Sequence, residues 1–214
     1  MPELVQRSLA CAALIVLMPL LAVLSLLVRL TSPGPVIYRA ERVGRRGTFI
    51  LYKFRSMTAD AARMGPGVTM AQDPRVTRFG RYLRSTKLDE LPQLWNVVRG
   101  EMLLVGPRPE DPRYIDMCNP LHQEVFAARP GLTGLTALAY RDEETLLASA
   151  AQEIARAEGR SSSTTADLDL AYRERILPAK LAMDADYLRH RSTRGDLAII
   201  GRTIGQVLQR AAHR

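Results

Sequence analysis

The sequence predicts an α+β fold that is predominantly helical, and three observations support this prediction. The chain has 214 residues, the length of one domain with a sizeable core. Residues 8–28 form a long uncharged apolar run, which is typical of a helix that meets a membrane. Short apolar runs within residues 36–52 predict a β-hairpin, whereas helical spacing of apolar residues dominates the remainder. We therefore expect a membrane-embedded segment at 1–30 and a single domain at 31–214.

Charge and composition narrow the classes of partner. A net charge of +8 and a pI near 10.0 indicate an anionic partner, which can be nucleic acid, anionic lipid or a phosphorylated substrate. The three histidines and two cysteines show no paired metal-ligand spacing, so a zinc site has little support. Cys11 and Cys118 offer at most one bridge, which favours a reducing compartment.

The apolar run at 8–28 is bracketed by Arg7 and Arg29. A simple transmembrane helix is the usual interpretation of such a run, and a signal peptide is disfavoured by its length. Pro19 lies in the middle, where proline removes a backbone hydrogen bond and bends a helix. Cations at both ends favour leaving both ends on one side of the membrane. A spanning helix and a re-entrant helix that enters and leaves by one face both stay open.

Two apolar runs, at 36–38 and 49–52, flank a glycine-arginine turn at 44–47 and predict a β-hairpin. After the second run, Lys53 and Arg55 alternate with aromatic residues, so both cations share one face of the strand. That face can line a site or simply face solvent.

Helices are expected to follow a connector at residues 65–74. Residues 76–83 predict a short amphipathic helix with arginines on or near one side, at positions 75, 78, 81 and 84. Such a helix can lie at a membrane interface or be an ordinary surface helix. Further helices are predicted at 121–128, 142–158 and 167–190, the last broken or bent near Pro178. Apolar residues at helical spacing within 197–207 form a stripe that is typical of a core-facing helix. A helix at the membrane interface is the alternative.

Adjacent carboxylates, Asp89 and Glu90, precede apolar residues at helical spacing, and Pro92 suits the first turn of that helix. The ordinary interpretation is that Asp89 caps the helix and Glu90 complements its dipole. Neighbouring side chains on a helix diverge by about a quarter turn. The pair therefore also suits two chemical roles, one carboxylate as a nucleophile and the other as an oxygen ligand of Mg²⁺.

Cations surround this pair in the sequence. Arg84, Lys87 and Arg108 can bind phosphate oxygens, for which arginine is well shaped. Pro107 and Pro109 fix an extended turn around Arg108, although they can also merely shape a connector. We expect Asp89 to stay ionised, because the helix dipole and Arg84 favour its charged form.

Several ordered motifs resemble one family. The central motif is Lys87-Leu88-Asp89-Glu90-Leu91-Pro92-Gln93-Leu94-Trp95-Asn96. The others lie at 32–36, 42–45, 51–57, 100–102, 105–109 and 129–134. Together they resemble the bacterial sugar transferases, the monotopic polyprenyl-phosphate phosphoglycosyl transferases in their small single-domain form, as far as about Arg141.

The resemblance implies transfer of a sugar 1-phosphate from a nucleotide diphosphate sugar, expected to be a UDP-sugar, to a polyprenyl phosphate such as undecaprenyl phosphate. It implies that Asp89 forms a phosphosugar–aspartyl intermediate with release of UMP, that Glu90 holds Mg²⁺ and that Lys53 lines the site. It also implies a helix-break-helix at Pro19 and a catalytic domain on the cytoplasmic face of the bacterial inner membrane. The reaction would open exopolysaccharide, O-antigen or glycoprotein glycan assembly.

This sequence departs from the family pattern in two places. Met18 precedes Pro19 where the family often has serine. Residues 135–141 stand where the family has a tryptophan-containing motif that ends in Asn-Gly-Arg, and only Arg141 matches. Arg141 is therefore a candidate phosphate or substrate contact, whereas the sugar preference is not carried over.

A membrane-anchored basic module without catalysis is the alternative function. It would bind nucleic acid or anionic lipid, and its binding would survive the loss of Asp89. Only Phe49, Tyr52 and Phe54 interleave with cations, and no nucleic-acid motif appears, so we expect membrane lipid but no nucleic acid as a partner. The sequence leaves open whether the protein forms a homodimer.

Overall fold

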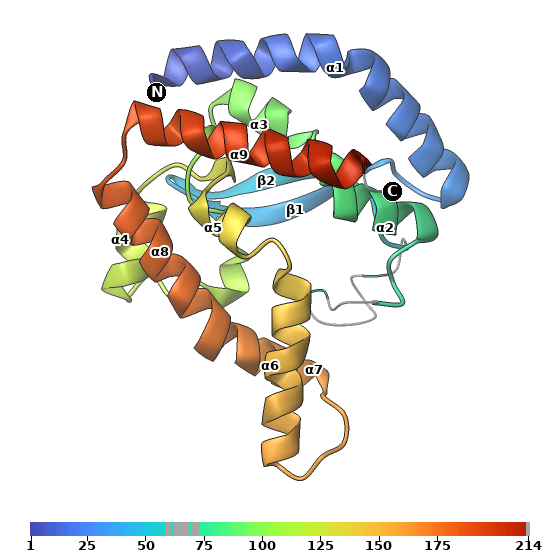
Figure 1. The fold of residues 1–214 in the computed structure, drawn as a ribbon, viewed down its shortest axis with the longest axis vertical. Helices are drawn as coiled ribbons and strands as arrows, with labels where there is room; N and C mark the ends of the chain where they lie inside the picture. The colour runs from blue at the N-terminus through green and yellow to red at the C-terminus, as the bar shows by residue number, and fades with distance from the viewer. Residues whose placement is uncertain (59–60, 62–68, 70–72, 213–214) are drawn as a thin grey trace.

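The computed structural model describes residues 1–58, 61, 69 and 73–212, and Figure 1 shows its ribbon. The described chain is mostly helical, with two sheets of two strands each, which confirms the predicted α+β class. The strands are β1 (Ile37–Gly44), β2 (Gly47–Phe54), β3 (Leu103–Val105) and β4 (Gly131–Thr133). The helices are α1 (Glu3–Thr31), α2 (Arg78–Thr86), α3 (Gln93–Arg99), α4 (Pro120–Phe126), α5 (Leu135–Ala139), α6 (Glu143–Ala157), α7 (Thr165–Ala171), α8 (Leu177–Arg189) and α9 (Thr193–Ala212). The connector predicted at 65–74 lies largely outside the described residues.

The N-terminal apolar segment is one helix, α1, which has Pro19 in its interior. Figure 1 shows it running across the molecule and then bending downward rather than breaking. A proline removes one backbone hydrogen bond and leaves the rest of the helical ladder intact, so a bend is sufficient. By length and composition α1 can cross a membrane, with a mean hydropathy of 2.8 over its most apolar window.

Both ends of α1 pack against the rest of the protein. Near its start, the Gln6 Oε1 atom accepts a hydrogen bond from the Leu104 backbone N–H at 2.9 Å. Near its end, Leu24 and Val28 are buried in a cluster with Phe54 of β2. The surface of α1 that faces away from the domain is apolar and exposed, with Leu4, Val5, Leu9, Ile15, Val16, Met18, Val23, Leu26 and Leu30.

The predicted hairpin is confirmed. Strands β1 and β2 pair antiparallel, and Gly44 lies opposite Gly47 across a turn of two arginines. Gly47 has φ +102°, in the left-handed region that favours glycine. Asn96 of α3 is fully buried and fixes α3 to β2, because its amide donates to the Ile50 carbonyl at 2.7 Å and accepts from the Tyr52 N–H at 3.2 Å.

A second, parallel strand pair was not predicted. Strands β3 and β4 each have three residues, which is too short to give a periodic pattern. Their pairing brings the loop that contains Arg108 beside the start of β4, where the Gly131 N–H donates to the Pro107 carbonyl at 2.8 Å.

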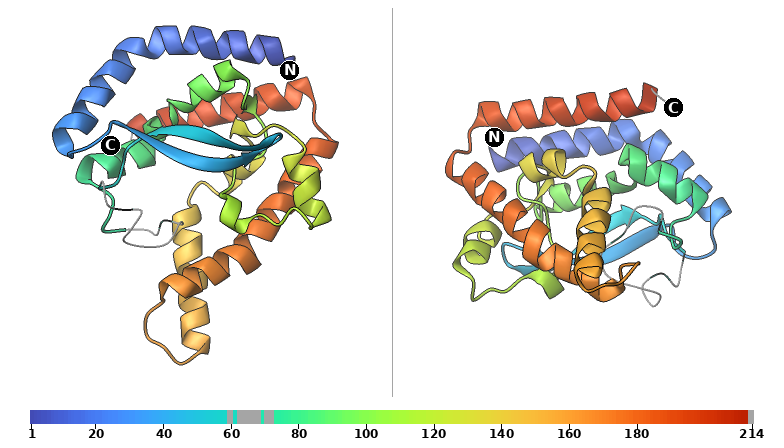
Figure 2. Two further views of the ribbon diagram at one scale, coloured as in Figure 1. Left: turned by 180° about the vertical axis from the view of Figure 1, so that it is seen from behind. Right: turned by 60° about the horizontal axis from the view of Figure 1, so that its bottom comes forward.

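The C-terminal helices follow the prediction with two differences. The helix predicted at 167–190 is present as α7 and α8, joined by a π-helical turn at Tyr172–Ile176, just before Pro178. The last helix, α9, lies beside the N-terminal half of α1 (Figures 1 and 2). The expectation that its stripe faces the core holds only in part, because Leu197 and Ile204 are each 54% exposed, whereas Ile200 and its neighbour Ile199 pack in a core cluster.

Gly80 provides a test of the packing that places α2. A Cβ at this position would lie 1.9 Å from the Ser56 carbonyl oxygen and 2.6 Å from its carbon, which are backbone atoms that cannot move aside cheaply. We expect Gly80→Ala to lower the free energy of unfolding by about 1–3 kcal/mol or more. The measurement is denaturant unfolding of the detergent-solubilised protein.

Gly201 of α9 is the matched control, since a Cβ there has no atom within 4 Å. Gly201→Ala should leave stability unchanged or raise it by up to about 1 kcal/mol, because alanine favours helix. Equal losses in the two variants would contradict the packing of α2 described here.

Candidate active site

A tight turn between α2 and α3 presents the two carboxylates. The backbone of Lys87 is left-handed, with φ 60°, the one such non-glycine residue in the described chain. This conformation costs an ordinary residue about 1–2 kcal/mol and is often kept at functional sites. A 3₁₀ turn at Leu88–Glu90 follows, and α3 begins at Gln93.

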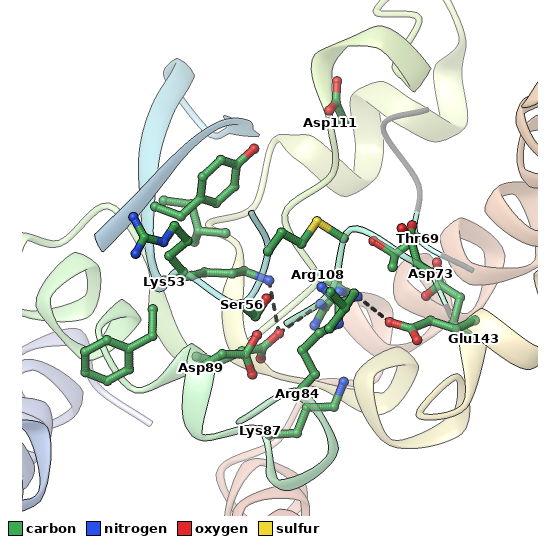
Figure 3. Close-up of a pocket in the computed structure, with 18 of the residues that line it drawn as sticks. Lys53, Ser56, Thr69, Asp73, Arg84, Lys87, Asp89, Arg108, Asp111 and Glu143 are labelled. Atoms are coloured by element: carbon green, nitrogen blue, oxygen red, sulfur yellow. Dashed lines mark hydrogen bonds and ion pairs between the residues drawn. The ribbon is translucent and has the colours of Figure 1, made fainter. Parts of the chain in front are cut away.

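The turn opens into a cavity of about 1280 Å³, larger than the roughly 300–1000 Å³ of typical small-molecule sites. Its walls come from β1, β2, α2, α5, α6 and the loop after β3 that carries Arg108, here called the arginine loop. Figure 3 shows Lys53, Asp89 and Arg108 pointing toward one another there. The sequence-predicted residues that line it are Lys53, Arg84, Lys87, Asp89, Glu90, Arg108, Pro109 and Arg141. Pro19 lies apart, in α1.

Glu90 is held by two cations. The Lys53 ammonium donates to its Oε1 atom at 3.1 Å, and the Arg108 guanidinium donates to the same atom at 3.0 Å. Burial by itself raises the pKa of Glu90, but the charges of Lys53 and Arg108 outweigh it and hold that pKa well below its usual range. Glu90 is therefore an ionised carboxylate that is bound by two cations, Lys53 and Arg108.

Asp89 has the opposite environment. Its side chain is 5% exposed, and its Oδ1 atom has no hydrogen-bond partner in the described part of the chain. It makes no capping hydrogen bond, so the ordinary interpretation of Asp89 as a helix cap is wrong. Burial, followed by the charge of Glu90, raises its pKa.

As expected, the charge of Arg84 favours the charged form of Asp89, together with those of Lys53 and Lys87, but burial and the charge of Glu90 outweigh these cations. The guanidinium of Arg84 forms an ion pair with Glu144 of α6. Asp89 lies in the 3₁₀ turn at Leu88–Glu90 and not in the first turn of α3, which begins at Gln93.

The other predicted arginine, Arg141, contacts the last helix. Its Nη1 atom donates to the Gln206 side-chain oxygen at 2.5 Å, and its Nη2 atom to the Gln206 carbonyl at 3.3 Å. Arg141 thus lines the cavity while α9 fixes its position. The sequence did not predict this contact between the cavity and α9.

Asp89 and Glu90 are the residues at this site that could hold Mg²⁺, although only together with ligands from elsewhere. The described residues contain no group of three or more histidine, cysteine or acidic side chains that could hold a metal alone. Mg²⁺ is usually bound by one or two carboxylates together with substrate phosphates and water, rather than by an all-protein cage. Lys53 and Arg108 both bind Oε1 of Glu90, and the unpaired Oδ1 of Asp89 is next to it in sequence. One or two carboxylates completed by a diphosphate would satisfy the ion.

Comparison with known proteins decides the family. Residues 2–210 match the bacterial sugar transferases. The chain belongs to this family. The chain is 39% identical over 197 residues to a UDP-glucose:undecaprenyl-phosphate glucose-1-phosphate transferase of Caulobacter vibrioides, an alignment that covers 89% of the chain and 63% of that protein.

Two further relatives have different sugars in their names. The bacterial sugar transferase is 34% identical over 217 residues to a UDP-galactose-lipid carrier transferase of Erwinia amylovora, covering 94% of the chain and 39% of that protein. It is 40% identical over 120 residues to a UDP-N-acetylgalactosamine-undecaprenyl-phosphate N-acetylgalactosaminephosphotransferase of Aeromonas hydrophila, covering 54% and 28%. The chain therefore spans less than two thirds of the length of these relatives.

A buried lysine that sequence reasoning missed supports the arginine loop. Lys180 of α8 is 2% exposed, and its ammonium lies 2.7 Å from Glu110 and 3.1 Å from Glu143. The Tyr172 hydroxyl donates to Glu110 at 2.6 Å. Glu110 follows Arg108 by two residues, so the contact between Lys180 and Glu110 fixes the arginine loop to α8. The feature of the sequence that could have revealed Lys180 is the position of a lysine on the apolar face of the helix predicted at 167–190.

Asp184, one turn after Lys180, supports the same loop. It accepts hydrogen bonds from the Thr136 hydroxyl at 3.0 Å and from the Arg108 backbone N–H. Burial raises its pKa from an ordinary 3.8 to about 7, although Thr136 and Lys180 oppose the shift and Glu110 adds to it. The folded protein thus favours the protonated carboxyl, whereas the unfolded chain ionises it near pH 4.

A pH series tests this environment of Asp184. Because the folded pKa is raised, the stability that Asp184 contributes falls as pH rises from about 4 to about 7. Asp184→Asn cannot ionise, so the variant should gain roughly 2–3 kcal/mol relative to the wild type between pH 5 and pH 8. Denaturant unfolding at the two pH values measures this difference. A stability gap that is the same at both would contradict a raised pKa.

Proposed function

We propose that the chain transfers a sugar 1-phosphate from a UDP-sugar to undecaprenyl phosphate or a similar polyprenyl phosphate, with release of UMP. The observation that carries this proposal is the unequal pair of carboxylates. Asp89 is buried with an unpaired oxygen, while Glu90 beside it is ionised and held by Lys53 and Arg108. The names of the relatives, which include UDP-sugars and undecaprenyl phosphate, support the same reaction class.

The first step is attack by a carboxylate oxygen of Asp89 on the β-phosphorus of the donor. A bond forms between that oxygen and phosphorus, the bond from phosphorus to the bridging oxygen breaks, and UMP leaves with the electron pair. An Asp89 oxygen without hydrogen bonds is suited to this role, because no donor has to be displaced before attack. Lys53 and Arg108 lie where they can bind phosphate oxygens as charge develops.

The second step returns Asp89 to its starting state. An oxygen of the lipid phosphate attacks the same phosphorus, the bond to Asp89 breaks, and the polyprenyl-diphospho-sugar leaves. Mg²⁺, when bound, would neutralise charge on the diphosphate, with Glu90 as its protein ligand. The ionised state of Glu90, which Lys53 and Arg108 maintain, suits it to that role.

The shape of α1 supports a re-entrant membrane segment. Both of its ends pack against one domain, and the helix bends in between (Figure 1). Its exposed apolar surface would then lie in one leaflet, with the cavity at the cytoplasmic face of the inner membrane. This arrangement would bring the carboxylates to a lipid phosphate without moving that phosphate across the membrane.

Release of UMP tests the reaction. We expect the detergent-solubilised wild type to release UMP in the presence of Mg²⁺, undecaprenyl phosphate and one or a few sugars from a panel of UDP-sugars. Asp89→Asn should lower the rate at least about 10³-fold, because the nucleophile is lost, and Glu90→Gln should lower it while raising the Mg²⁺ requirement. Equal rates in wild type and Asp89→Asn would remove Asp89 as nucleophile. Anionic-lipid binding without UMP release from any donor would favour the non-catalytic basic module.

The ion pair of Arg84 with Glu144 gives a separate prediction. Glu144 forms an ion pair with the guanidinium of Arg84, which a donor phosphate would have to replace. Both side chains are partly exposed, so the pair is worth about 1 kcal/mol or less. Glu144→Gln should lower the KM for the UDP-sugar by about two- to fivefold. Glu153→Gln, which breaks the exposed pair with Arg175, is the control and should leave KM unchanged. A raised KM in Glu144→Gln would mean that Glu144 orders Arg84 for the donor instead.

A further inference from the structure

Arg55 is the most unusual cation in the described chain outside the cluster at Glu90. It follows β2 directly, its side chain is 7% exposed, and it lines the cavity. Its Nη2 atom donates to the Ser32 carbonyl at 2.5 Å. Its Nε and Nη1 atoms are buried and have no hydrogen-bond partner among the residues that the structure describes. Most of the donors of this guanidinium therefore have no acceptor.

The surroundings of Arg55 add positive charge rather than balance it. Burial lowers its pKa, and the charge of Arg29 in the last turn of α1 lowers it further. Among the residues that the structure describes, no carboxylate contributes to that balance. A buried charge without a counter-ion is costly, so proteins retain one mainly where a ligand supplies the opposite charge.

Its position indicates which ligand that is. Ser32, to which Arg55 is bonded, is the first residue after α1, and the Arg55 N–H donates to the Val36 carbonyl at 2.9 Å. The neighbouring Phe54 is buried against Leu24 and Val28 in the second half of α1. Arg55 thus lies where the apolar helix ends and the cavity begins. Lipid phosphates lie at the level where apolar helices leave the membrane.

A purely structural role explains only part of this geometry. One hydrogen bond to Ser32 would tie the end of α1 to β2, and a smaller donor could provide it. It does not explain why a residue at the cavity wall keeps a buried planar guanidinium whose Nε and Nη1 atoms have no acceptor among the described residues. Such a guanidinium matches the oxygens of a phosphate.

We infer that Arg55, with Arg29 beside it, is the subsite that takes the phosphate of the lipid acceptor. The inference rests on the proposed function, since it assigns the second substrate of that reaction. It separates the cations into two groups. Lys53 and Arg108 bind the diphosphate of the donor, and Arg55 binds the phosphate of the lipid acceptor at the end of α1.

The two half-reactions test this division. UMP release in a single turnover with donor alone needs Asp89 but no acceptor, whereas steady-state turnover needs both. Arg55→Gln should leave the single-turnover release within about twofold of wild type and raise the KM for undecaprenyl phosphate tenfold or more. Arg55→Lys keeps the charge but not the planar guanidinium, so its KM for undecaprenyl phosphate should lie between those of the wild type and Arg55→Gln. It supplies the measurement if the glutamine variant does not fold.

Arg7→Gln is the matched control, because Arg7 also donates to a backbone carbonyl, that of Val98 at 2.9 Å, but at the other end of α1. Its acceptor KM should equal that of wild type. An unchanged acceptor KM in Arg55→Gln, or loss of the single-turnover release in parallel with turnover, would overturn the inference. Absence of UMP from the wild type would instead reject the proposed function.

Binding separates the sources of the phosphate and does not depend on catalysis. Labelled undecaprenyl phosphate, without donor, should bind Arg55→Gln at least tenfold more weakly than wild type in nanodiscs of neutral lipid. If the subsite takes a phospholipid headgroup instead, the two proteins will bind the acceptor equally. Removal of phosphatidylglycerol will then lower the activity of the wild type alone, and that outcome contradicts the inference.

Discussion

The hydrogen bonds from Lys53 and Arg108 to one oxygen of Glu90 organise the centre of this molecule. Each cation comes from a different part of the chain, so the contact exists only when three elements are in place. The hairpin delivers Lys53, and Asn96 fixes that strand to α3, just after the carboxylates. The strand pair β3–β4 and the buried Lys180 fix the loop that carries Arg108.

This arrangement makes two adjacent acids chemically unequal. Glu90 receives both cations and stays ionised, whereas Asp89 is left buried without a partner for Oδ1. Environments that push the pKa values of neighbouring acids apart are a general sign of divided roles.

Sequence patterns predicted the local elements well and the environments poorly. The hairpin, α2, α6 and the residues that line the cavity follow from turn residues, periodicity and ordered motifs, which are local information. The effect of Arg84 on the pKa of Asp89 was predicted with the right sign, but the larger effect of burial was missed, because burial depends on what packs around the turn. Lys180 and Asp184 were missed for the same reason, since their partners lie on other elements. Strands of three residues carry too little pattern to be recognised.

The central claim is that Asp89 becomes covalently attached to the donor phosphosugar. Intact-mass spectrometry of the protein after incubation with Mg²⁺ and its UDP-sugar, without lipid acceptor, tests it most directly. The wild type should gain the mass of one phosphosugar, mapped to the peptide that contains Asp89, and undecaprenyl phosphate should remove it. Turnover without any adduct on the wild type, or an adduct of equal yield on Asp89→Asn, would contradict the claim.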